Sequence, residues 1–300
     1  MISLLVDVLG PVVIIVTIGA FALPRLGVDP KTLSTLAFWV LGPAFVFDLF
    51  AQSNLSGGLV ARLVLSGLAG MVAAGLLSLA ANRIAGSTGS VTAASVMTSA
   101  YGNVGNAGLA ITSFALGPTA LAAAGVLMLT VNVTGITLGV ALAEGQQGSI
   151  RSAIGRSLRT PMTVAAGAAV LLNLTNVTTP LALDRAVGLL AGAMIPVMLL
   201  GLGGQLARTT ITEFTADLAI SSVAKLLVAP TAAGVVALAL GLGGDDLGAV
   251  VLQSAMPPAV FCLAVALERD LEPERVTTAV VALTILSIVT LPMVLFILDP

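Results

Sequence analysis

The segment Tyr101-Gly102-Asn103-Val104-Gly105-Asn106-Ala107-Gly108 interrupts an apolar stretch that runs from residue 90 to residue 116. Glycine and asparagine are poor helix formers. Each unsatisfied backbone group in hydrocarbon would add several kcal/mol, so such a break persists in a membrane only where it faces protein or a water-filled cavity. The segment therefore predicts a broken transmembrane helix, with Gly102 and Gly108 among the residues that break it.

A second break lies in the other half of the chain, at Gln253-Ser254-Ala255-Met256-Pro257-Pro258. Pro257 and Pro258 each lack a backbone N–H group and clash with the preceding helical turn. Interrupted spans at corresponding positions of two halves are the sequence pattern that points to a transporter's binding site. Close packing of helices through the glycines is the alternative explanation of the first break.

The rest of the chain is almost entirely apolar. Hydrophobic residues make up 58% of the 300 residues and charged residues 9%, whereas a soluble domain has about a quarter charged. Ten apolar stretches each come near the roughly 20 residues that cross a bilayer. The predicted spans are 3–23, 32–51, 58–81, 91–116, 119–143, 161–177, 185–206, 218–242, 247–267 and 275–298. These spans predict an all-α polytopic membrane protein.

Prolines and glutamines recur at matching positions in the two halves of the chain, which indicates an internal repeat. The interval from Pro11 to Pro30 in the first half equals the interval from Pro161 to Pro180 in the second. Likewise, the interval from Pro43 to Gln52 equals the interval from Pro196 to Gln205. We therefore divide the chain into a five-helix repeat over 1–143, a cytoplasmic linker over 144–160 and a second five-helix repeat over 161–300. Because five is odd, the second repeat must insert upside-down relative to the first, an arrangement of many secondary transporters.

The basic residues predict the orientation, because cytoplasmic loops carry an excess of Lys and Arg. Nine of the twelve basic residues fall in loops on one side: Arg25, Lys31, Arg83, Arg151, Arg156, Arg159, Arg208, Arg269 and Arg275. The opposite side holds Arg62 and Arg185, and Lys225 lies within a span. We expect that both termini lie on the non-cytoplasmic side of the membrane.

The breaks also predict the chemistry of the site. Each exposes the N-terminus of a half-helix near mid-membrane, where free N–H groups and the helix dipole favour a carboxylate. The preceding half-helices offer free carbonyls, which suit a cation instead. The candidate substrate-binding residues are Asn103, Gly105, Asn106, Asn132, Gln253, Met256, Pro257 and Pro258. For Asn132, helix–helix hydrogen bonding is an equally good explanation.

Three charged residues are candidates for a counter-charge or for ion coupling. Lys225 either snorkels to the cytoplasmic interface, as lysines near helix ends do, or provides a positive charge for an anion. Asp7 and Asp48 lie near the outer ends of their spans, where they either carry a coupling proton or simply face solvent. Neither a metal site nor a cofactor is expected.

The Asn103 to Gly108 break, the Met256-Pro257-Pro258 segment and the Lys225 to Pro230 helix resemble the auxin efflux carrier family. The resemblance covers essentially the full length of the chain. It implies that the broken helices 4 and 9 cross at the substrate site. It also implies a scaffold of helices 1, 2, 6 and 7, a transport bundle of helices 3–5 and 8–10 that moves like an elevator, and a homodimer. The family often has proline where this chain has Ala110.

These observations predict a secondary transporter of the bacterial inner membrane that exports a small organic anion, such as a carboxylate or an auxin-like acid. A sodium-coupled organic-anion symporter of the bile-acid type is the alternative, and coupling to H⁺ or to Na⁺ is left open. An enzyme is not expected, because the chain has no histidine and no carboxylate pair within its spans. The net charge of −2 and the absence of a basic stripe give no indication of a nucleic-acid partner.

Overall fold

The computed structural model describes residues 5–53, 55–144, 150–175, 177, 179–208 and 214–298. Every regular element within these ranges is helical, with one isolated β-bridge. The chain divides into two compact units. The first unit comprises Met1–Val8, Val60–Val131 and Arg208–Pro300, and the second comprises Leu9–Leu59 and Asn132–Ala207.

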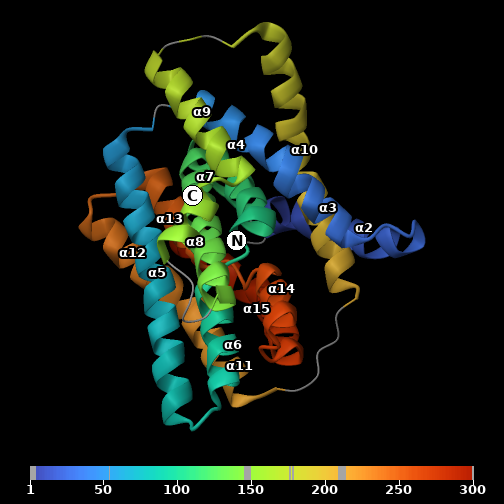
Figure 1. Cartoon of the computed structure of the whole chain (residues 1–300), viewed down its shortest axis with the longest axis vertical. Helices are drawn as coiled ribbons and strands as arrows, with labels where there is room; N and C mark the ends of the chain where they lie inside the picture. The colour runs from blue at the N-terminus through green and yellow to red at the C-terminus, as the bar shows by residue number, and fades with distance from the viewer. Residues whose placement is uncertain are drawn as a thin grey trace. The chain divides into compact units, whose positions relative to one another are not determined.

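The helices of the N-terminal half follow one another with short connections (Figure 1). They are η1 (Leu5–Leu9), α2 (Gly10–Arg25), α3 (Pro30–Leu36), η2 (Ala37–Leu41), α4 (Gly42–Ala51), α5 (Gly57–Ile84), α6 (Gly89–Ala100), η3 (Val104–Gly108) and α7 (Leu109–Glu144). Those labelled η are single π-helical turns. Helix α7 turns at Gly117, whose φ of 79° favours glycine. The turn lies between the fourth and fifth predicted spans.

The helices of the C-terminal half begin at α8. They are α8 (Ile150–Leu158), α9 (Pro161–Thr175), α10 (Leu181–Leu206), α11 (Ala216–Val223), η5 (Ala224–Val228), α12 (Ala229–Ala239), α13 (Gly244–Ser254), α14 (Phe261–Arg269) and α15 (Pro273–Leu298). Helix α8 lies within the segment predicted as a linker, of which residues 145–149 lie outside the described residues.

Seven helical stretches of the described chain are long and apolar enough to cross a membrane. They are Val6–Arg25, Pro30–Ala51, Gly57–Ile84, Val104–Gly135, Leu181–Leu206, Ala216–Ala239 and Pro273–Leu298. The ten predicted spans exceed this number for a physical reason. The first break leaves α6 with 12 residues and joins the rest of the predicted fourth span to the fifth in Val104–Gly135. The second break divides the predicted ninth span into the short helices α13 and α14, and α9 has only 15 residues.

Three of the π-helical turns end two residues before a proline, at Pro11, Pro43 and Pro230. Proline removes one helical donor and crowds the preceding turn, so the helix locally widens. The turn η3 also ends two residues before Ala110. The fourth helix is therefore interrupted without a proline at this position.

The second unit is held together by two close helix pairs, α2 with α10 and α4 with α9. A Cβ atom at Gly19 would lie 2.2 Å from the Leu200 carbonyl oxygen, and one at Gly203 would lie 1.9 Å from the Val16 carbonyl oxygen. Both positions therefore require glycine. Small residues of this kind let membrane helices approach closely.

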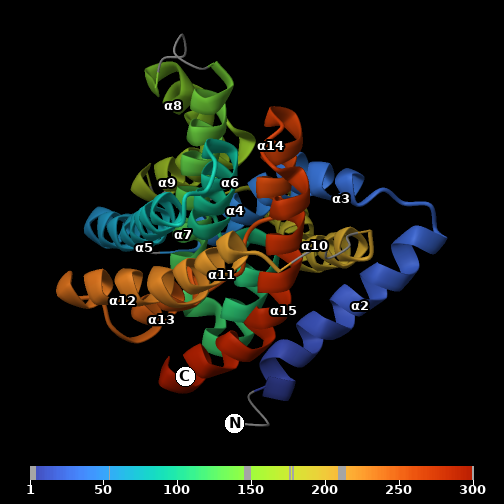
Figure 2. The same cartoon turned by 90° about the horizontal axis from the view of Figure 1, so that it is seen from below.

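The first unit contains the broken helices, and α12 and α13 run side by side within it (Figures 1 and 2). Small buried residues line one face of α5: Ser66, Gly67, Gly70, Ala74 and Ser78. A Cβ atom at Gly70 would lie 2.7 Å from the Ala229 carbonyl oxygen of α12. This close approach of α5 to α12 forms one wall of the cavity described below.

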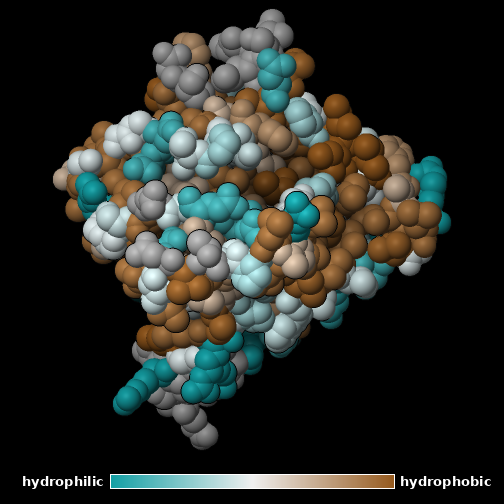
Figure 3. Space-filling model, turned by 90° about the horizontal axis from the view of Figure 1, so that it is seen from above, coloured by the Kyte–Doolittle hydropathy of each residue, from teal (hydrophilic) through white to brown (hydrophobic). Residues whose placement is uncertain are grey.

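Large apolar side chains cover much of the surface seen in Figure 3. Among the described residues, Leu189 is 79% exposed and Phe296 is 66% exposed. Soluble monomers rarely expose continuous apolar surface of this kind, whereas a bilayer removes it from water. The surface therefore agrees with the membrane-spanning lengths of the helices.

Candidate functional site

The two broken helices meet inside the first unit. Residues 101–103 separate α6 from η3, and residues 255–260 separate α13 from α14. Gly102 and Pro258 form an antiparallel β-bridge. The flanking bonds run from the Asn103 N–H to the Pro257 carbonyl, at 2.7 Å, and from the Ala259 N–H to the Tyr101 carbonyl, at 3.0 Å. We call these two segments the crossover.

The crossover satisfies backbone groups that the breaks remove from the helices. An interrupted helix leaves its last carbonyls and its next N–H groups without intrahelical partners. Inside protein these groups need other partners, and the bridge supplies several of them. The Gly108 N–H also donates to the Asn103 carbonyl at 3.1 Å, which closes the π-helical turn. Gly102, Pro257 and Pro258 therefore lie where the helices are interrupted, whereas Gly108 lies inside a helical turn.

Gly108 has a different role from the one predicted. A Cβ atom there would lie 2.3 Å from Gln253 Oε1 and 3.0 Å from Gln253 Cδ. Gln253 is 1% exposed, and its Nε2 donates to Thr112 Oγ1 at 3.2 Å. Glycine at this position does not break the helix. It makes room for the buried amide of the opposite broken helix.

Lys225 lies in the π-helical turn η5, a type of turn that is frequent at functional sites. The residue is 2% exposed, and its Nζ donates to the Ser254 carbonyl at 3.3 Å. The snorkelling interpretation is therefore wrong. Ser254 is the last residue of α13, and carbonyls at a helix C-terminus attract cations. The side chain turns inward because this carbonyl offers an acceptor inside the protein.

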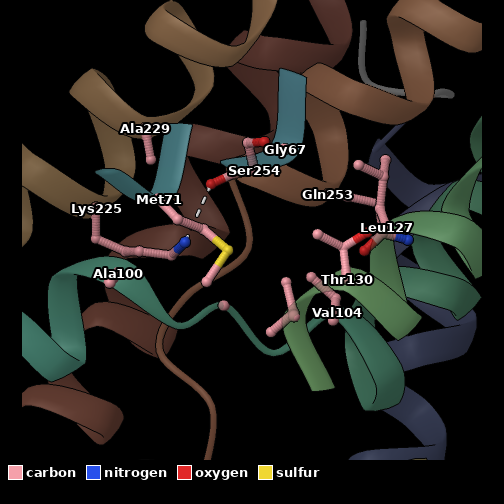
Figure 4. A pocket seen from close by; sticks show the side chains of 12 residues that line it. Gly67, Met71, Ala100, Val104, Leu127, Thr130, Lys225, Ala229, Gln253 and Ser254 are labelled. Atoms are coloured by element: carbon pink, nitrogen blue, oxygen red, sulfur yellow. Dashed lines mark hydrogen bonds between the residues drawn. The ribbon is translucent and has the colours of Figure 1, made fainter. Parts of the chain in front are cut away.

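A small cavity lies beside the crossover, and Lys225 points into it (Figure 4). The lining residues are Gly67, Met71, Ala100, Gly102, Val104, Leu127, Thr130, Val131, Lys225, Ala229, Gln253 and Ser254. Lys225 is the one charged residue among them. The volume of about 20 Å³ has room for a single water-sized species. A larger molecule requires the cavity to open.

The other predicted residues divide between the crossover and the rest of the chain. Asn103 and Met256 are buried in the crossover and contribute backbone contacts there, while Gly105 and Asn106 follow in η3. Gly105 lies against Met128, since a Cβ atom there would be 3.7 Å from its Sδ. The lining of the cavity includes neither asparagine of this segment.

Three predicted residues lie apart from the crossover contacts. Asn132 belongs to the second unit, where its Nδ2 donates to Met162 Sδ at 3.6 Å. Asp48 also belongs to that unit and accepts from Gln52 Nε2 at 2.7 Å. Asp7 is exposed in η1. In the described part of the chain, no group of three His, Cys, Asp or Glu residues is placed to hold a metal ion.

Several lining residues were not predicted from the sequence: Gly67, Met71, Ala229 and Ser254. Gly67 and Met71 are four residues apart on α5 and so share a face of the helix. The small residues that recur along α5 mark this buried face, and their spacing was a signal that could have identified it. Ser254 directly follows Gln253 in the second break.

The fold and the crossover define a polytopic membrane protein with two broken helices that meet at a buried lysine. Residues 5–295 match the model of a family described as "Membrane transport protein". The chain belongs to this family, and the resemblance to auxin efflux carriers is confirmed.

The protein is similar to several curated transporters. An "Uncharacterized transporter" of Methanothermobacter thermautotrophicus is 28% identical over 291 residues, which covers 94% of each chain. A "Putative malonate transporter" of Rhizobium meliloti is 27% identical over 210 residues, which covers 66% of this chain and 65% of the relative. An "Uncharacterized transporter" of Escherichia coli is 30% identical over 179 residues, with 57% and 56% of the two chains covered.

Proposed function

We propose that the protein is a secondary transporter that exports a small organic anion, whose carboxylate binds at the crossover. One observation carries this proposal. Lys225 is buried beside the crossover, lines the cavity, and has no carboxylate within ion-pair distance among the described residues. An ammonium group buried without a counter-charge is strongly unfavourable, and an anionic substrate supplies that charge.

Other groups of the crossover complete the site. The first turn of η3 presents backbone N–H groups at a helix N-terminus, which favour an anion. Asn103 directly precedes this turn and Asn106 lies within it, and the amide of Gln253 lies against its last residue, Gly108. The relative named for malonate supports carboxylates as the substrate class.

The helix pairs support ten spans in two inverted repeats. In that arrangement α2 is the first span, α4 ends the second, α9 is the sixth and α10 is the seventh. The contacts pair the first span with the seventh and the second with the sixth. Exchanging the two repeats turns one of these pairs into the other, as expected for a pseudo-two-fold axis.

The division into units supports elevator-type alternating access. The second unit holds the four helices proposed as scaffold together with the end of α7 from Asn132, and the first unit holds the rest of the helices proposed as transport bundle. Movement of the bundle is also a way to open a cavity of about 20 Å³ to a carboxylate. We place the protein in a bacterial inner membrane as a homodimer, with both termini on the non-cytoplasmic side.

A sodium-coupled symporter remains the rival function. Its cation would bind carbonyls at the ends of the half-helices. The Ser254 carbonyl at the end of α13 already binds the Lys225 ammonium, and a second cation beside it would be repelled. This contact favours an anion carrier.

The test is a current measurement on proteoliposomes adsorbed to a solid-supported membrane. The panel contains malonate, malate, lactate and indole-3-acetate, each in sodium and in choline buffer. The proposal predicts a saturable current for at least one acid, and counterflow of the labelled acid. Asn103→Ala should weaken transport while the protein remains folded. Silence across the panel from folded protein, in both current and counterflow, would contradict the proposal, and a current that requires sodium would favour the rival.

A further inference from the structure

We infer that Lys225 is a tethered cation that takes the place of a coupling sodium ion. Its ammonium group occupies the carbonyl end of α13 and neutralises one carboxylate of the substrate. Transport then requires no sodium. This inference rests on the proposed function and adds to it the charge balance of the site and the ion dependence of transport.

The contacts of the ammonium group leave it able to bind a ligand. A lysine ammonium has three N–H donors, and among the described residues the Ser254 carbonyl is the acceptor that it contacts. A Cβ atom at Gly102 would lie 3.0 Å from Lys225 Nζ and 3.4 Å from its Cε. The side chain therefore lies directly against the crossover backbone, in space that only glycine leaves free.

The surroundings of Lys225 do not neutralise it. The helices packed against η5 are α6, α11, α12 and α15. Within the described residues, their carboxylates are Asp217 on α11 and Glu274 on α15. Asp217 is paired with Arg275 at 2.7 Å, and neither carboxylate contacts Lys225.

With Lys225 protonated, the lining of the cavity carries one positive charge. A singly charged carboxylate head therefore balances the site, and a second carboxylate would have to face backbone N–H groups. A free cation has no place at the same carbonyl, because like charges a few ångströms apart repel strongly away from water. The Ser254 carbonyl at this end of α13 is already occupied by the protein's own ammonium group.

The first arm of the test needs no variant. Wild-type proteoliposomes are assayed with lactate and malonate as probes, in sodium and in choline buffer. The half-saturating concentration and maximal current should be equal in the two buffers. A sodium requirement would overturn the inference. Silence with every acid would instead count against the proposed function.

The second arm compares Lys225→Met with Lys31→Met. The chain has two lysines, and Lys31 is exposed in the second unit, so it provides a matched control. Lys225→Met should raise the half-saturating concentration by about 30-fold or more, because an anion then loses its buried partner. Lys31→Met should match the wild type, and Lys225→Arg should retain saturable transport. Unchanged kinetics in Lys225→Met would overturn the inference.

A third arm separates lost charge from lost folding. Lys225→Ala leaves space where the side chain was, so added methylammonium can supply the missing cation. We expect methylammonium to restore part of the current in this variant and to leave the wild-type current unchanged. A folded Lys225→Ala protein that transports at the wild-type rate without the amine would also overturn the inference.

Discussion

Replacing Gly108 by alanine tests the interlocking of the two broken helices. The added Cβ atom would lie 2.3 Å from Gln253 Oε1, 3.0 Å from Cδ and 3.2 Å from Nε2. Ordinary contact begins near 3.4 Å, so the amide must move by about 1 Å. Gln253 is 1% exposed, and this movement disturbs its hydrogen bond to Thr112.

Opposing contributions decide the sign of the effect. Overpacking a core costs about 1–3 kcal/mol, and a disturbed hydrogen bond adds about 0.5–1.5 kcal/mol. The higher helix propensity of alanine stabilises the folded protein by about 1 kcal/mol. The expected net change, the sum of these contributions, is a destabilisation of about 0.5–3.5 kcal/mol. If Gly108 served only as a helix breaker, alanine would stabilise the protein instead.

The assay is thermal unfolding of purified protein in detergent. The midpoint temperature Tm should fall by several degrees in Gly108→Ala. Gly75→Ala is the control, because its Cβ atom would meet nothing closer than 3.8 Å, and its Tm should be equal or higher. In a Gln253→Ala background the Gly108→Ala change should lose its penalty. A Gly108→Ala protein at least as stable as the wild type would refute the reasoning.

Two further substitutions test the cavity. Gly102→Ala should push the Lys225 ammonium group aside by a few tenths of an ångström. Because small misplacements weaken binding, the half-saturating anion concentration should rise about 3- to 10-fold, while Tm changes little. Unchanged transport kinetics would contradict the contact between Gly102 and Lys225. Met71→Ala removes a flexible side chain from the cavity wall. In competition assays, the affinity for bulkier acids such as indole-3-acetate should therefore rise relative to the affinity for malonate. An unchanged ranking would place Met71 outside the substrate path.

The positions of the helix breaks could be predicted from local chemistry. The Gly-rich segment after Ala100 and the proline pair at Pro257 are poor helix formers in any surroundings, and the structure interrupts its helices there. The turn at Gly117 follows in the same way from a glycine before a proline. The division between transport bundle and scaffold came from family resemblance rather than from residue chemistry.

Contacts between distant residues could not be predicted in this way. The bond from the Asn103 N–H to Pro257 joins two segments of different halves, and hydropathy carries no information about which segments pair. The direction of Lys225 depends on the free carbonyl of Ser254. A lysine near the end of a predicted span has the same local pattern whether it snorkels or turns inward. Gly108 likewise needs its partner Gln253 before its role is apparent.

The most direct test of the central claim is NMR of the two lysines. Protein labelled with ¹⁵N at the lysine Nζ atoms gives one signal from Lys31 and one from Lys225, which Lys225→Met assigns. Titration with an acid that the protein transports should shift the Lys225 signal saturably and leave the Lys31 signal unchanged. Saturable transport of an acid that leaves the Lys225 signal unmoved would contradict anion binding at the crossover.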